Sequence, residues 1–155
     1  MPGTTAAKQA KAFIRMSSRR WPVLVGLLAV LASACKDSSS SPIIPQVPVN
    51  AQLNVSSQLY PDLRQDGGFA YLQEGYKGII VVRQSASSYF AFERACPYDP
   101  TNSCALEVDP SRLFIVDPCC GSQFNLKGQV IGGPAIVGLR QYRTSLVAST
   151  LYISN

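Results

Sequence analysis

Two short stretches rich in cysteine decide the fold of this chain: residues 95–104 read ACPYDPTNSC, and residues 117–124 read DPCCGSQF. They hold four of the five cysteines in the 155 residues, and this cysteine usage is typical of an oxidising compartment. Histidine is absent from the whole chain. Its absence excludes His-based acid–base catalysis, Ser/His or Cys/His nucleophile pairs, and any metal site that needs imidazole.

The sequence around these stretches is typical of β-strands. Residues 51–55 alternate between apolar and polar side chains, and glycines mark turns between the β-rich runs that follow. These runs occupy residues 69–72, 79–83, 89–93, 113–116, 140–146 and 150–153. No segment keeps a helical period over three turns. We therefore predict one all-β domain over residues 49–155, which contain 12 of the 14 aromatic residues.

Further elements follow the second stretch in a recognisable order. Gly128 lies in a turn, Gly133-Pro134-Ala135 comes next, and Leu139 stands three residues before Tyr142. With the two cysteine stretches, this order resembles the Rieske iron–sulfur domain family. In that family, Cys-x-His and Cys-Pro-Cys-His-Gly-Ser-x-Phe/Tyr loops precede a Gly turn, a Gly-Pro-Ala loop and a Leu-x-x-Tyr strand. The resemblance covers residues 91–153 and implies an antiparallel β-sandwich with a small loop-rich subdomain around residues 95–135.

The same resemblance shows where this chain departs from the family. A Rieske [2Fe–2S] cluster is held by two Cys on one iron and two His on the other. Carried over by position, Cys96 keeps the first cysteine ligand, but Tyr98 stands in place of the first histidine. Asp117 replaces the second cysteine, and Cys120 replaces the second histidine. We therefore expect neither the family's [2Fe–2S] cofactor nor another metal here, and no catalytic residue.

Many members of the family carry a disulfide between the two loops, at positions that match Cys104 and Cys119. The resemblance therefore implies this bridge here. Cys96 and Cys120 face the former cluster cavity in the carried-over fold, and two close thiols in an exported protein tend to oxidise. We predict a second disulfide, Cys96–Cys120. A bridge that closes a loop of this length contributes about 3 kcal/mol in the chain-entropy model.

Residues 1–34 are predicted to be a signal peptide. Residues 21–34 are uncharged and almost all apolar, and they follow Arg19-Arg20 directly. This run is shorter than the roughly 20 residues that a membrane-spanning helix needs, but it matches a secretory signal. Its end, Leu31-Ala-Ser-Ala-Cys35, resembles a bacterial lipobox, which implies cleavage before Cys35 and acylation of that residue. The alternative is ordinary cleavage after residue 34, which leaves a soluble secreted protein.

Residues 35–48 are predicted to be the lipidated cysteine and a tether. Four consecutive serines are followed by three prolines, a composition that forms a semi-extended spacer and buries no core. Five of the 14 basic residues precede residue 21, so the other 9 balance the 9 acidic residues, which all follow residue 35. The net charge of +5 therefore belongs to the signal peptide, and we expect no nucleic-acid partner.

Two other uses of the cysteines stay open. A thiol–disulfide redox protein usually carries a Cys-x-x-Cys pair at a helix N-terminus, and neither feature is visible in this sequence. A Rieske-type electron-transfer protein with atypical ligation needs a different metal centre. Its candidate ligands are either Cys96, Cys104, Cys119 and Cys120, or Cys96, Cys120, Asp117 and Tyr98.

These observations predict an exported lipoprotein of the bacterial cell envelope that is not an enzyme. Acyl groups on Cys35 anchor it to the membrane, and the Rieske-like domain over residues 49–155 acts as a binding or structural module. We expect an unidentified protein partner at the tip formed by residues 96–104, 117–122 and 132–135.

Overall fold

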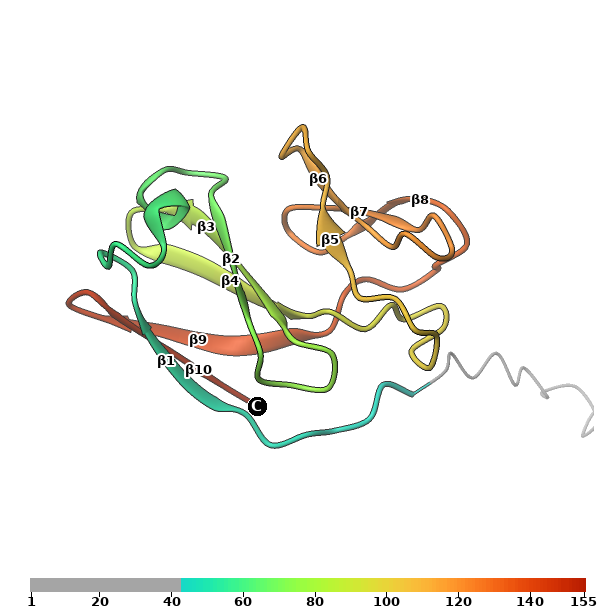
Figure 1. Cartoon of the computed structure of the whole chain (residues 1–155), viewed down its shortest axis with the longest axis horizontal. Helices are drawn as coiled ribbons and strands as arrows, with labels where there is room; N and C mark the ends of the chain where they lie inside the picture. The colour runs from blue at the N-terminus through green and yellow to red at the C-terminus, as the bar shows by residue number, and fades with distance from the viewer. Residues whose placement is uncertain (1–42) are drawn as a thin grey trace, which may run out of the picture. The chain divides into compact units, whose positions relative to one another are not determined.

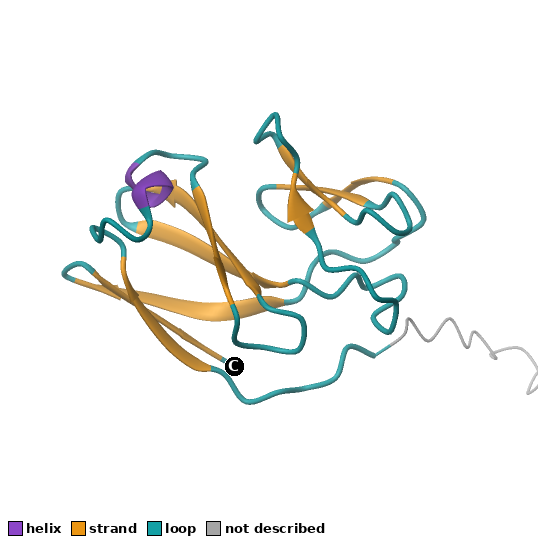
Figure 2. Ribbon diagram, in the orientation of Figure 1, coloured by secondary structure: helices purple, strands orange, loops and turns teal. Residues whose placement is uncertain are grey.

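The computed structural model describes residues 43–155, and these residues form an all-β fold (Figures 1 and 2). The predicted all-β class is therefore confirmed. The predicted signal peptide, Cys35 and the tether up to residue 42 lie outside the described residues. Within residues 43–155, no helix has the length and apolar character needed to cross a membrane.

Six antiparallel strands form the larger sheet, in the order β1-β10-β9-β4-β3-β2. They are β1 (Asn50–Asn54), β2 (Phe69–Leu72), β3 (Ile79–Ser85), β4 (Ser88–Glu93), β9 (Gln141–Val147) and β10 (Thr150–Ser154). Each strand overlaps a run that the sequence predicts. Only two residue pairs, Ala91–Tyr142 and Phe92–Gln141, join β4 to β9. This short ladder connects the hairpin of the last two strands to the first half of the domain.

Four shorter strands form a second antiparallel sheet, in the order β5-β6-β7-β8. They are β5 (Glu107–Val108), β6 (Phe114–Val116), β7 (Gln123–Asn125) and β8 (Val130–Gly132). This sheet is the framework of the predicted loop-rich subdomain, and only β6 was predicted as a strand. Strands of two or three residues are too short to show an alternating pattern. One 3-10 helix, η2 (Pro61–Arg64), lies between β1 and β2.

Strand β3 is buried on both faces because it lies between two hydrophobic cores. Its residues Ile79 to Val82 are all fully buried, and successive side chains of a strand point to opposite faces. One face of β3 packs in the core inside the larger sheet, and the other face packs against the smaller sheet. The first core contains Ile79 and Val81 together with Leu53, Leu151 and Ile153. The second core contains Ile80 and Val82 together with Phe92, Ile115 and Phe124.

The last residues of the predicted tether lie against the domain. The Arg140 side chain donates a hydrogen bond to the Pro45 carbonyl at 2.9 Å, and the Asn155 side chain donates to the Val47 carbonyl at 3.1 Å. The Val49 amide in turn donates to the side-chain oxygen of Asn155. Residues 45–48 are therefore held against Arg140 and the C-terminal residue Asn155.

We expect Phe92→Ala to destabilise the domain by about 3–5 kcal/mol, because Phe92 is almost fully buried in the core between the two sheets. Urea unfolding followed by circular dichroism measures the change. The control is Tyr152→Ala on β10, where the side chain is 41% exposed; we expect a much smaller loss there. Equal losses in the two variants would contradict the assignment of this core.

Candidate functional site

Two loops approach one another at one end of the smaller sheet. The first loop, residues 95–105, follows β4, and two hydrogen bonds between Arg94 and Leu106 close its base. The Leu106 amide donates to the Arg94 carbonyl, and Arg94 Nε donates to the Leu106 carbonyl, both at 2.8 Å. The second loop, residues 117–122, connects β6 to β7. A disulfide between Cys104 and Cys119 joins the two loops, so the bridge implied by the resemblance is confirmed.

Asp117 organises the second loop. Its side chain is fully buried, and its Oδ1 accepts hydrogen bonds from the amides of Cys119 at 2.7 Å and Cys120 at 3.1 Å. Its backbone carbonyl accepts a bond from the Gly121 amide at 2.9 Å. A short polar side chain that binds the amides following it is a common turn device. The residue that the resemblance places at the second cysteine position is thus a turn-forming carboxylate in this structure.

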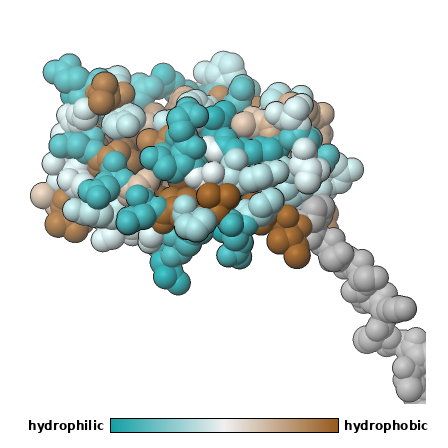
Figure 3. Space-filling model, turned by 60° about the horizontal axis from the view of Figure 1, so that its bottom comes forward, coloured by the Kyte–Doolittle hydropathy of each residue, from teal (hydrophilic) through white to brown (hydrophobic). Residues whose placement is uncertain are grey.

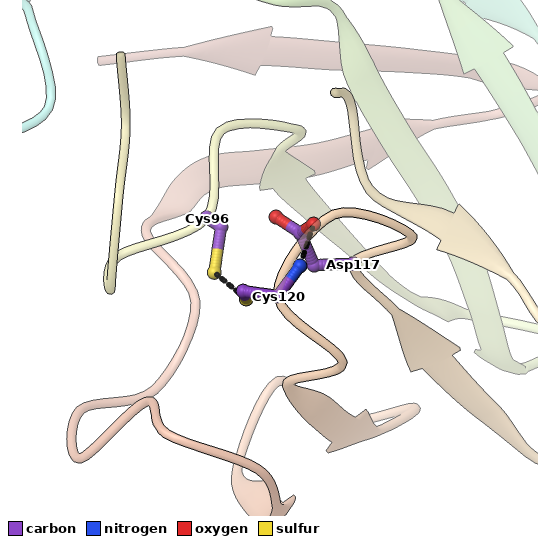
Figure 4. Close-up of side chains that lie close together, drawn as sticks. All are labelled: Cys96, Asp117 and Cys120. Carbon is purple, nitrogen blue, oxygen red and sulfur yellow. Dashed lines mark hydrogen bonds between the residues drawn. The ribbon is translucent and has the colours of Figure 1, made fainter. Parts of the chain in front are cut away.

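Cys96 and Cys120 face each other across the two loops (Figure 4). Their sulfur atoms are 3.6 Å apart, and both are free thiols. A disulfide has its sulfurs about 2.05 Å apart, so the predicted Cys96–Cys120 bridge is not formed in this structure and stays a prediction. The Cys120 sulfur also lies 3.0 Å from Ser122 Oγ, which accepts a hydrogen bond from the Ala135 amide at 3.1 Å. Ser122, which the sequence analysis did not single out, therefore ties the third loop, residues 133–139, to the thiol pair.

The two thiols have different surroundings. Cys96 is fully buried, whereas Cys120 is partly exposed. Burial raises the pKa of the Cys96 thiol to about 11, although hydrogen bonds from the backbone at Tyr98 and Asp99 act in the opposite direction. This thiol is therefore protonated at neutral pH in the structure as it stands.

Tyr98 does not fill the space between the loops. The sequence analysis placed it at the position of the first histidine ligand, but its side chain is 49% exposed. The space is instead occupied by the Cys96 and Cys120 thiols and the Asp117 carboxylate, whose potential ligand atoms all lie within 4.8 Å of one another.

Two charged residues that the sequence analysis missed hold the first loop in place. Glu93, at the end of β4, is fully buried and accepts hydrogen bonds from the amides of Tyr76 at 2.8 Å and Lys77 at 2.9 Å, and from the Tyr142 hydroxyl at 2.6 Å. The Lys77 ammonium then donates to the Cys104 carbonyl at 2.8 Å and to the side chain of Asn102 at 3.1 Å. The sequence did contain a signal for Glu93, because it is a single acidic residue at the end of a largely apolar strand.

Apolar side chains are exposed on the loops around the site. Ile136 is 80% exposed and Val137 is 42% exposed, both in the third loop, and Tyr98 of the first loop is also exposed. In the space-filling view, apolar residues are scattered among hydrophilic ones on the face shown (Figure 3). Ile136 and Val137 lie just beyond the residues 132–135 that were predicted for the contact surface.

The residues at this site do not fit a Rieske [2Fe–2S] cluster. That cluster needs four side-chain ligands, two of which are imidazoles, and the chain has no histidine. Cys104 and Cys119 are bonded to each other, so the predicted four-cysteine alternative has only two thiols left. Three donors converge: Cys96, Asp117 and Cys120.

No family model and no curated protein matches the chain. Among solved structures, the chain is similar to the crystal structure of the cyanobacterial plasma membrane Rieske protein PetC3 from Synechocystis PCC 6803. The identity is 22% and the TM-score is 0.49, and the match covers 66% of this chain and 99% of that chain. The all-β fold of this chain rests on its own strand pairing and its two cores.

The buried Tyr142–Glu93 hydrogen bond predicts a pH dependence. Burial and the neighbouring Glu93 carboxylate raise the pKa of Tyr142 above its usual value of about 10. A raised pKa contributes stability that is complete below the unfolded-state pKa and is lost as pH rises beyond it. We therefore expect Tyr142→Phe to be less stable than the parent at pH 8, and this difference to shrink above about pH 10.

Urea unfolding at pH 8 and at pH 10.5–11 measures this effect. Tyr152→Phe is the matched control, because that tyrosine is exposed on β10. Its stability should follow that of the parent at both pH values. A constant difference between Tyr142→Phe and the parent over this range would contradict the prediction.

Proposed function

We propose that this chain is a lipoprotein of the bacterial cell envelope whose Rieske-like domain works without a [2Fe–2S] cluster, as a binding module and not as an enzyme. One observation carries the proposal. The two loops keep the bridge between Cys104 and Cys119, while the positions of three cluster ligands hold Tyr98, Asp117 and Cys120. Two loops that are joined by a disulfide but lack three of the four cluster ligands favour binding of a partner over a function that needs the cluster.

The contact surface of this module is proposed at the tip of the smaller subdomain. Its loops are held in place by the disulfide, by Asp117 and by the Lys77 ammonium, so the surface is ordered before a partner binds. Its loops carry the exposed apolar side chains of Tyr98, Ile136 and Val137. Aromatic and aliphatic groups on an ordered surface suit a protein partner, because binding them costs little conformational entropy.

The anchor part of the proposal rests on the N-terminal sequence. A basic flank, a short apolar run and a small-residue ending precede Cys35, and a Ser/Pro-rich spacer follows it. With Cys35 acylated and Cys104–Cys119 bridged, only the Cys96 and Cys120 thiols remain. The chain then has no unpaired cysteine near its mature N-terminus, which exported proteins usually avoid.

Two other functions each have one observation in their favour. Convergence of Cys96, Asp117 and Cys120 favours an electron-transfer protein with atypical ligation, but a two-iron cluster then lacks a fourth side-chain ligand. The 3.6 Å separation of the two thiols favours a thiol–disulfide redox protein. Reactive thiols have a lowered pKa, whereas burial raises the pKa of Cys96. The binding module therefore agrees best with the site.

We expect the full chain, purified anaerobically, to contain less than stoichiometric iron and to show no visible charge-transfer bands, because no His₂Cys₂ ligand set exists in it. Iron analysis and absorbance spectra check this. Stoichiometric iron together with bands above about 400 nm, a region where protein without a cofactor does not absorb, would sink the clusterless proposal.

We expect Cys35→Ser to abolish labelling with radioactive palmitate and to move the protein from the membrane to the soluble fraction, because the acyl chains supply the membrane affinity. Labelling followed by fractionation measures both effects. Cys120→Ser is the matched control, since it removes a different cysteine, and it should leave labelling and membrane association unchanged. Palmitate retained in Cys35→Ser would contradict the anchor.

A further inference from the structure

We propose that Cys96, Asp117 and Cys120 form a binding site for a single thiophilic divalent cation, and that Zn²⁺ is the ion this donor set fits. The site differs from the cluster site of the Rieske family in its ligands and in the number of metal ions. The proposal replaces the expectation from the sequence that no metal binds here, because that expectation was made without the geometry of the three donors. It goes beyond the proposed function and depends neither on the lipid anchor nor on the partner surface.

The separation of the two sulfurs matches a shared ion. Zinc–thiolate bonds are about 2.3 Å long and zinc sites are tetrahedral, so two thiolates on one ion have their sulfurs about 3.8 Å apart. The Cys96 and Cys120 sulfurs are 3.6 Å apart in the structure. The two ligands therefore need to move by only a few tenths of an ångström to bind one ion between them.

Asp117 supplies the third donor with its orientation already set. Its Oδ1 accepts the amides of Cys119 and Cys120, which fix the carboxylate in the loop. Its Oδ2 has a single partner, the Asn102 amide nitrogen, at 3.5 Å. Hydrogen bonds that hold a ligating carboxylate in place are typical of metal sites, where the outer partners orient the ligand.

One of the two sulfurs has a polar neighbour that suits a thiolate ligand. Ser122 Oγ lies 3.0 Å from the Cys120 sulfur, and a hydrogen bond to a thiolate favours its charged form. Cys96 is fully buried, so the ion itself displaces the proton of that thiol when it binds.

The donor set selects the type of ion. Two sulfurs and one carboxylate oxygen suit zinc, while Mg²⁺ and Ca²⁺ prefer oxygen ligands only. Three protein ligands leave the fourth tetrahedral position for water or for a donor from another molecule. Cys120 is the partly exposed member of the site, so the open position is expected on its side.

Oxidation of the pair to a disulfide excludes zinc binding. Bond formation between Cys96 and Cys120 removes two protons and two electrons, which a disulfide such as oxidised glutathione takes up to become two thiols. The bonded sulfurs are no longer thiolates and cannot hold the ion. Bound zinc should therefore protect both cysteines from this oxidation, and the two states can be separated by experiment.

The test uses the full chain with Cys35→Ser, which removes the fifth cysteine as a metal ligand, purified anaerobically with two free thiols and the Cys104–Cys119 bridge intact. Competition with a chromophoric chelator should show one Zn²⁺ per chain. Co²⁺ in place of zinc should give a thiolate-to-cobalt charge-transfer band. We expect Cys96→Ser, Cys120→Ser and Asp117→Asn each to weaken zinc binding at least about tenfold. Glu107→Gln is the acidic control, because Glu107 is exposed on β5, and it should leave zinc binding unchanged.

Peptide mapping of the Cys104–Cys119 bridge in each variant reports whether the loops have folded. Absence of zinc binding to the chain with two free thiols would overturn the proposal. The same conclusion follows if zinc binds but both cysteine variants retain the parent affinity, because the ion then lies elsewhere. These outcomes are distinct from failure of the clusterless function, which shows as stoichiometric iron.

Discussion

The burial of strand β3 on both faces is the constraint on which the rest of the domain depends. Residues Ile79 to Val82 are fully buried, and each contributes roughly 1.5–3 kcal/mol when its side chain leaves water. Alternate side chains pack in different cores, so one strand joins the larger sheet to the smaller sheet. This explains why four consecutive residues of β3 are buried, whereas β1 and β10 of the same sheet alternate between buried and more exposed positions.

The neighbouring strand β4 connects these buried cores to the candidate site. Phe92 packs in the core between the sheets, and the next two residues, Glu93 and Arg94, begin the polar contacts that position the first loop. Glu93 holds the amide of Lys77, whose ammonium reaches the Cys104 carbonyl. Arg94 pairs with Leu106 at the base of the loop. The packing of strand β4 therefore determines where Cys96 lies.

The sequence predicted the parts of the fold that have long periodic patterns. Every strand of the larger sheet overlaps a predicted run, because strands of four to seven residues show alternation or a continuous apolar run. Strands β5, β7 and β8 have two or three residues, which is too short for such a pattern. Strand β6 is equally short, but Leu113 precedes it and extends its apolar run to four residues. The Cys104–Cys119 bridge was implied by the family resemblance and is confirmed. The role of Glu93 and the exposure of Tyr98 depend on long-range packing that no local pattern reveals.

The two loops keep a fixed conformation without a cluster. A buried carboxylate needs hydrogen bonds, and those that satisfy Asp117 come from the amides of Cys119 and Cys120, so the second loop holds its own shape. Ser122 extends this network to the Ala135 amide in the third loop. Every buried polar side-chain atom among residues 43–155 has a hydrogen-bond partner. These hydrogen bonds hold two thiols and a carboxylate close together in an ordered site. Because the loops are already ordered, an ion or a partner that binds there meets little entropic cost.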